Sequence, residues 1–101
     1  MAKVTVNRLD GFIGKGIRYH YDIPADVMYA RLAAKMGAES YGEETDEGFI
    51  LLRSLDEDSL VGVTIVGYWE RFGHGRLEDA PVSDVVKGVR QVAERMLTPA
   101  A

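Results

Sequence analysis

The chain has 101 residues, of which 47% are hydrophobic and 28% are charged. This composition is typical of one folded domain and excludes the low-hydrophobicity, high-charge class of disordered proteins. No cysteine is present, which excludes disulfides, thiolate metal sites and cysteine nucleophiles. The net charge of −4 disfavours a nucleic-acid partner, because such proteins need a broad cationic surface. We expect a single domain over residues 1–101.

The N-terminal region, residues 1–18, predicts a strand and a glycine-rich turn. Residues 2–7 alternate between apolar and polar side chains, and glycines follow at positions 11, 14 and 16, as in a tight turn. Residues 17–21 then place Ile17, Tyr19 and Tyr21 on one side, which is the period of a half-buried strand. The two strands are expected to form a hairpin.

The first residues alternate between apolar and polar side chains and do not form the apolar run of a signal peptide, and no stretch is long enough to span a bilayer. We therefore expect a soluble, cytoplasmic protein without a membrane partner.

Residues 24–36 fit two different structures. Pro24 in a first turn, an alanine-rich stretch and Gly37 just past the end fit a helix of about three turns. The same residues also alternate as a strand would, with Tyr29 and Arg31 on one face. The residues alone leave both structures open, and the resemblance described below slightly favours the strand.

The middle of the chain predicts an acidic loop and a second hairpin. Residues 39–48 contain five acidic residues and two glycines, which predicts a solvated loop. Residues 49–53 form a short apolar run, and residues 60–68 are rich in β-branched side chains. Residues 56–59, which are three acidic residues and a serine, are expected to form a turn between these two runs, so the runs are predicted to pair.

Residues 79–98 predict an amphipathic C-terminal helix. Pro81 opens the segment, apolar residues recur every three or four positions, and Pro99 follows the end. Valine is only a fair helix former and Gly88 costs about 1 kcal/mol relative to alanine, so the helix depends on packing. The predicted fold class is α+β: a small, largely antiparallel sheet of about five strands with the C-terminal amphipathic helix packed on it.

No group of residues has the spacing of a catalytic or metal site. The two histidines, His20 and His74, have no neighbouring metal-ligand pattern. Glycines 11–16 lack the spacing of a phosphate-binding loop, and no serine lies in a nucleophile elbow. Asp22 and Asp26 fit a turn, where aspartates hydrogen-bond to nearby backbone. The sequence thus predicts no catalytic residue, metal or cofactor, and favours a protein that is not an enzyme.

The segment 68–76 is the strongest candidate for binding. It combines the only tryptophan with other aromatic residues, two arginines and two glycines, and Trp, Tyr and Arg dominate binding hot spots. The alternative is that Trp69 and Phe72 close one end of the core, and the sequence leaves both interpretations open. With two polar anchors from residues 24–36, the candidate binding residues are Tyr29, Arg31, Tyr68, Trp69, Arg71, Phe72, His74 and Arg76.

Two short signatures resemble a known family. Residues 21–32 read Tyr-Asp-Ile-Pro-Ala-Asp-Val-Met-Tyr-Ala-Arg-Leu, and residues 55–65 read Leu-Asp-Glu-Asp-Ser-Leu-Val-Gly-Val-Thr-Ile. They resemble the domain of unknown function family 2283, and the likeness covers residues 19–66. The chain differs from the family pattern at Thr64, Gly67 and Tyr68, where the family often has Glu and Asp-Ala. The positions that match the pattern are Tyr21, Asp22, Asp26, Tyr29, Arg31, Leu32, Gly48, Leu60, Gly62 and Ile65.

The resemblance implies a fold and a class of role, but no reaction. It implies a β core over residues 19–66, to which residues 1–18 and the C-terminal helix are additions. Such proteins resemble partner-binding modules, and some occur in two-gene cassettes that resemble toxin and antitoxin pairs.

Three functions are expected from these observations. The first is a protein-interaction module that self-associates, as a homodimer, or binds another protein. The second is a small-molecule-binding module or enzyme that uses the aromatic and arginine loop, with Tyr29 and Arg31 as anchors in the same cleft. The third is an antitoxin-like inhibitor whose acidic residues 39–48 attract a basic partner.

Overall fold

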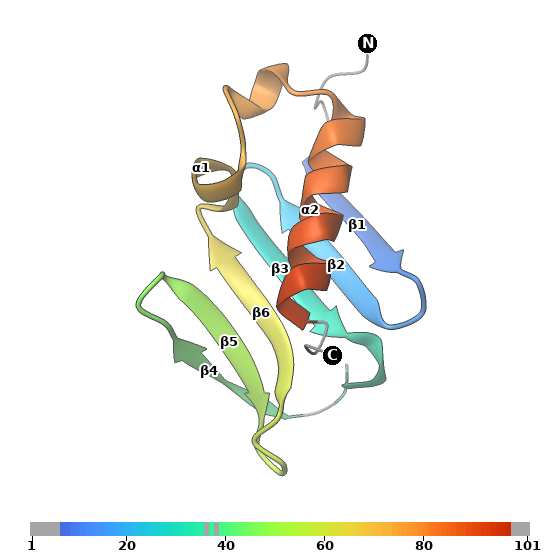
Figure 1. The fold of residues 1–101 in the computed structure, drawn as a ribbon, viewed down its shortest axis with the longest axis vertical. Coiled ribbons are helices and arrows are strands. Elements are labelled where there is room, and N and C mark those ends of the chain that lie inside the picture. Colours follow the sequence, from blue (N-terminus) through green and yellow to red (C-terminus); the bar gives the residue numbers. More distant parts are fainter. Residues whose placement is uncertain (1–6, 36, 38, 98–101) are drawn as a thin grey trace.

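The fold is a six-stranded antiparallel sheet with one long helix on one face (Figure 1). The computed structural model describes residues 7–35, 37 and 39–97. The spatial order of the strands is β1-β2-β3-β6-β5-β4. The α+β class is confirmed, with six strands in place of the expected five. The elements are β1 Arg8–Ile13, β2 Ile17–Asp22, β3 Val27–Leu32, β4 Ser40–Glu44, β5 Phe49–Ser54, β6 Leu60–Val66, α1 Tyr68–Phe72 and α2 Val82–Leu97, with single 3-10 turns at Ala33–Lys35 and Leu77–Asp79.

The core lies between α2 and the sheet. The helix packs across β1, β2, β3 and β6, and it lies over these strands in Figure 1. Alternate strand residues point toward it, so that each strand contributes one apolar face. Burying one large apolar side chain contributes about 1.5–3 kcal/mol, which explains how a valine-rich helix is held in place. Fully buried members of this core include Tyr21, Met28, Val63, Ile65, Val85 and Val89.

Residues 27–32 form a strand, which settles the choice between helix and strand. β3 lies in the middle of the sheet and pairs with β2 on one side and β6 on the other. Met28 and Ala30 are buried under α2, whereas Tyr29 points to the other face. Pairing along both edges outweighs the local helix preference of an alanine-containing stretch.

The structure corrects the predicted N-terminal region at its glycine-rich turn. The strand expected at residues 2–7 lies almost entirely outside the described residues, and the first observed strand is Arg8–Ile13. The glycine turn is limited to residues 14–16. Gly11 lies within β1, directly opposite Tyr19, and a side chain there would clash with the Tyr19 ring. Gly11 therefore makes room for an aromatic ring instead of making a turn.

Two predicted loops contain regular structure. The acidic loop at 39–48 includes β4, an edge strand that pairs only with β5 and whose side chains are mostly exposed. Short, charged edge strands are common because charge discourages pairing with other chains. The segment after β6 begins with α1. The N-cap residue of this helix is Gly67, whose backbone adopts the left-handed conformation with φ 72°. Polarity predicted the exposure of β4 but not its backbone pairing.

Replacing Gly62 with alanine is expected to destabilise the sheet. A Cβ at this position in β6 would lie 2.8 Å from the Ala30 carbonyl oxygen and 3.1 Å from Leu52 Cδ1. Because backbone cannot move aside cheaply, we expect Gly62→Ala to lower the free energy of unfolding by about 1–3 kcal/mol in a urea titration. Gly16→Ala is the matched control, since a Cβ at Gly16 meets no atom within 4 Å. Equal effects of the two substitutions would contradict this packing.

Candidate functional site

The β2–β3 turn positions α1 through Asp26. This residue adopts the left-handed region, with φ 55°, which aspartate tolerates better than most residues. Its Oδ1 accepts hydrogen bonds from the Tyr21 hydroxyl at 2.6 Å and the Trp69 amide at 2.8 Å. Its carbonyl oxygen accepts two more, from the amides of Gly67 at 2.8 Å and Tyr68 at 3.1 Å. Asp26 thus joins the turn to the start of α1 through contacts distant in sequence, whereas the bond to nearby backbone expected of a turn aspartate is made by Asp22, which accepts from the Ala25 amide at 3.2 Å.

Two buried tyrosines surround this connection. The rings of Tyr21 and Tyr68 meet edge to face, with centroids 5.1 Å apart. Burial raises the pKa of Tyr21 well above its ordinary value, and the hydrogen bond to the Asp26 carboxylate raises it further. Burial, with a smaller contribution from the Asp26 charge, raises the pKa of Tyr68 to about 12. Both hydroxyls therefore stay protonated at neutral pH, which fits a role in the core.

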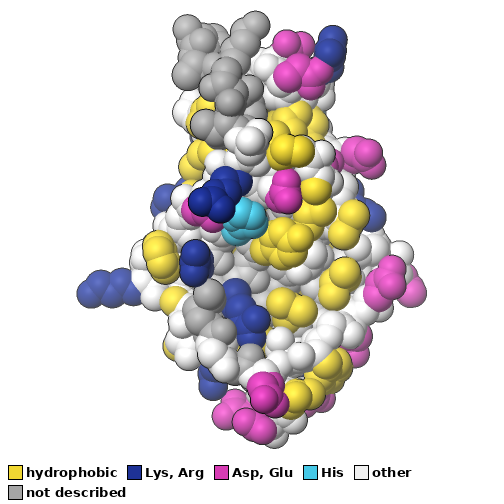
Figure 2. Space-filling view, turned by 180° about the vertical axis from the view of Figure 1, so that it is seen from behind, with side chains coloured by type: hydrophobic (Ala, Val, Ile, Leu, Met, Phe, Trp, Pro, Cys, Tyr) yellow, Lys and Arg dark blue, Asp and Glu magenta, His cyan; other side chains and the backbone are white. Residues whose placement is uncertain are grey.

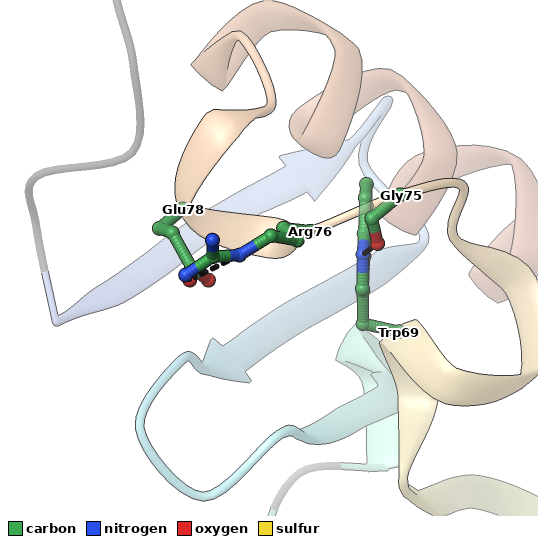
Figure 3. A network of polar contacts seen from close by, with 4 residues as sticks. All are labelled: Trp69, Gly75, Arg76 and Glu78. Atoms are coloured by element: carbon green, nitrogen blue, oxygen red, sulfur yellow. Dashed lines mark hydrogen bonds and ion pairs between the residues drawn. The ribbon is translucent and has the colours of Figure 1, made fainter.

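The aromatic side chains of segment 68–76 close one end of the core. Tyr68 is buried, and Trp69 and Phe72 are partly buried against the core cluster. The Trp69 indole Nε1 donates to the Gly75 carbonyl oxygen at 2.8 Å, which folds the following loop back onto α1 (Figure 3). This arrangement matches the interpretation of these aromatics as core residues.

The arginines of the same segment make local contacts. The Arg71 guanidinium lies 5.4 Å from the centroid of the Phe49 ring and donates to the carbonyl oxygens of Val66 and Glu47. It therefore ties α1 to the turn between β4 and β5. Arg76 is exposed and pairs with the Glu78 carboxylate (Figure 3).

A broad hollow of about 730 Å³ lies between α1, the following loop and the first turns of α2. We call it the α1–α2 hollow. Its polar lining mixes both signs of charge, with His74, Arg76 and Lys87 near Asp79 and Asp84. Because positive and negative side chains are both present, the lining favours neither an anionic nor a cationic ligand.

The sheet has a second face, which α2 does not cover. We call this the open face: it consists of the strand residues that point away from α2. Figure 2 shows this side of the molecule, where basic side chains gather around a histidine and hydrophobic side chains form a band beside them. Large apolar residues here are well exposed, with relative exposures of 57% for Phe12, 43% for Tyr29 and 50% for Val66.

A smaller hollow of about 230 Å³ lies on the open face. We call it the arginine hollow, because strand register places Arg18 of β2 directly opposite Arg31 of β3. Arg31 is in turn opposite Gly62, and Gly62 is opposite Leu52. The residues that line it are Asp10, Arg18, Tyr19, His20, Tyr29, Ala30, Arg31 and Leu52.

The polar contacts of the arginine hollow differ between its rim and its centre. At the rim, Asp10 Oδ1 lies 2.6 Å from His20 Nδ1, and its Oδ2 lies 3.4 Å from Arg8 Nε. The hydrogen bond with His20 is the main cause that lowers the pKa of Asp10. In the centre, Arg31 Nη2 donates to Ser40 Oγ at 3.4 Å. Arg18 makes no hydrogen bond or ion pair with any residue that the structure describes.

The candidate residues from the sequence fall into two places. Tyr29 and Arg31 line the arginine hollow, whereas the candidates from segment 68–76 belong to α1, its loop and the α1–α2 hollow. The expected cleft that combined both groups is thus divided between two hollows. Sequence reasoning missed Arg18 and Leu52 as site residues. The alternation of residues 17–21 predicted that Arg18 lies on the face of the strand away from the core. The register between β2 and β3, which places Arg18 opposite Arg31, could not be predicted from it.

Comparisons with protein-family models, curated proteins and solved structures found no match for this chain. The resemblance to domain of unknown function family 2283 stays a prediction. Within residues 7–35, 37 and 39–97, no helix is long and apolar enough to cross a membrane. The same residues contain no group of three or more histidine, aspartate or glutamate side chains placed to hold a metal ion.

Stability is expected to fall in alkali, in part because of Tyr21. Its pKa is raised in the folded protein, whereas an unfolded tyrosine ionises near pH 10. Its contribution is therefore complete below about pH 10 and declines as the pH rises above that value. Urea unfolding at several pH values from 9 to 11 should show a shallower decline for Tyr21→Phe than for the unsubstituted chain. Parallel declines would contradict the assignment.

Proposed function

We propose that this chain is a non-enzymatic protein-interaction module that binds another protein through the open face of its sheet. The observation that carries the proposal is that α2 packs on one side only, while the other side presents exposed apolar residues next to arginines. Apolar surface beside polar residues is typical of interaction sites. Aromatic and arginine side chains are also the residues that contribute most to binding in protein interfaces.

Charge indicates the chemistry of the partner. Arg8, Arg18 and Arg31 are on the open face, although the whole chain has a net charge of −4. An acidic partner segment with apolar neighbours complements this surface, because opposite charges steer association and apolar contacts hold the complex. Self-association is the competing outcome, and a symmetric dimer would require the same patch to be self-complementary.

The α1–α2 hollow supports a second candidate function, the binding of a small molecule. Its volume of about 730 Å³ lies within the range of about 300–1,000 Å³ that is common for ligand pockets. The antitoxin-like alternative stays a prediction. Its acidic residues lie on and around β4, where Glu43 is already 3.3 Å from Arg53.

A pair of lysine substitutions tests the open face as the binding surface. Val66→Lys places a charge among the exposed apolar residues of the open face, whereas Leu55→Lys makes the same change in the β5–β6 turn. Both parent side chains are about equally exposed, at 50% and 56%. The protein captured from the host would be purified, and its affinity for each variant measured by calorimetry.

We expect Val66→Lys to weaken that affinity at least about tenfold, because a lysine ammonium is strongly hydrated and opposes apolar contact. Leu55→Lys should change it less than about twofold. Light scattering on the free chain reports self-association in the same experiment. A strict monomer that captures no protein, or equal effects of the two variants, would contradict the proposal.

A further inference from the structure

We propose that the arginine hollow binds a carboxylate group of the partner protein between Arg18 and Arg31. The inference rests on the proposed function, because it assigns the chemistry that the open face recognises. It makes Arg18 and Arg31 binding residues and leaves the exposed apolar residues as the surrounding contact surface.

Two positively charged side chains, Arg18 and Arg31, line the arginine hollow. Arg18 and Arg31 are directly opposite each other on neighbouring antiparallel strands, where like charges destabilise a sheet. Arg18 is exposed and has no hydrogen-bond or ion-pair partner among the described residues. Both side chains line the same hollow, so an anion bound there is attracted by two positive charges.

The acidic residue of the arginine hollow, Asp10, contacts two side chains other than Arg18. Asp10 lines the same hollow, but its two oxygens contact His20 at 2.6 Å and Arg8 at 3.4 Å. The Asp10 charge also interacts with Arg18, but no ion pair joins the two side chains within the described residues. The exposed Arg18 guanidinium can therefore still donate to a group from outside. Guanidinium groups present parallel N–H donors that match the two oxygens of a carboxylate.

The arginine hollow is small and partly apolar. Gly62 has no side chain, and Leu52 and the Arg31 stem lie over it, so that this side of the hollow is apolar. Tyr29 adds an aromatic ring at the edge. The volume of about 230 Å³ is smaller than that of common small-molecule pockets and fits one acidic side chain with its apolar stem. These surroundings favour a protein carboxylate over a nucleotide or another large anion.

Nuclear magnetic resonance with three matched probes tests the inference. Phenylacetate supplies a carboxylate beside a ring, phenyl phosphate supplies a different oxyanion, and benzyl alcohol supplies the ring without charge. We expect saturable shifts of the Arg18 and Arg31 Nε–H signals with phenylacetate at physiological salt, and none with benzyl alcohol. Arg18→Gln should weaken phenylacetate binding at least about tenfold.

Lys15→Gln is the matched control, because it removes the same charge from the exposed β1–β2 turn, outside the hollow. It should change phenylacetate binding less than about twofold. Three results would overturn the inference: shifts that do not saturate, equal losses in the two variants, or binding of phenyl phosphate without binding of phenylacetate.

Measurements on the captured partner separate this inference from the proposed function. If Val66→Lys weakens partner binding but Arg18→Gln does not, the open face is the interface and the carboxylate assignment is wrong. If the probes bind at Arg18 while both variants keep full partner affinity, the hollow binds carboxylates and the proposed interface is wrong. We expect both variants to weaken partner binding.

Discussion

The architecture depends on one geometric constraint, which is that the one long helix packs on four strands of a six-stranded sheet and on one face alone. α2 has 16 residues, a length of about 24 Å at 1.5 Å per residue, and it packs on β1, β2, β3 and β6. All the fully buried large side chains named above lie on that side or on the helix itself. Within the described residues no helix covers the open face, where Phe12, Tyr29 and Val66 are exposed.

Asp26 links this sheet to its cover. The chain leaves β6, forms α1 and only then reaches α2, so the position of α1 determines how the long helix approaches the sheet. The Asp26 carboxylate and carbonyl hold the first residues of α1 against the β2–β3 turn. Because the Tyr21 hydroxyl donates to the same carboxylate, the connection is continuous with the core. An acidic residue that looked like part of a family signature has a clear structural task.

Sequence reasoning worked where a pattern is local. The alternation of Ile17, Tyr19 and Tyr21 and the spacing of apolar residues in α2 each predicted an element and its buried face. It failed where long-range pairing decides: β4 is exposed and acidic, and only its backbone bonds to β5 make it a strand. The arginine hollow depends on the register of β2 with β3 and of β3 with β6, which no short segment encodes. Segment 68–76 was correctly seen as aromatic and cationic, but its tertiary contacts could not be read from composition.

The open face and the α1–α2 hollow are two candidate surfaces for function, and they carry different side chains. Hydroxyl-radical footprinting of the full chain, alone and saturated with its captured partner, compares them directly. We predict strong protection of Phe12 and Tyr29 on the open face, with Trp69 and His74 oxidised as in the free chain. Protection of Trp69 and His74 with unchanged Phe12 and Tyr29 would contradict it.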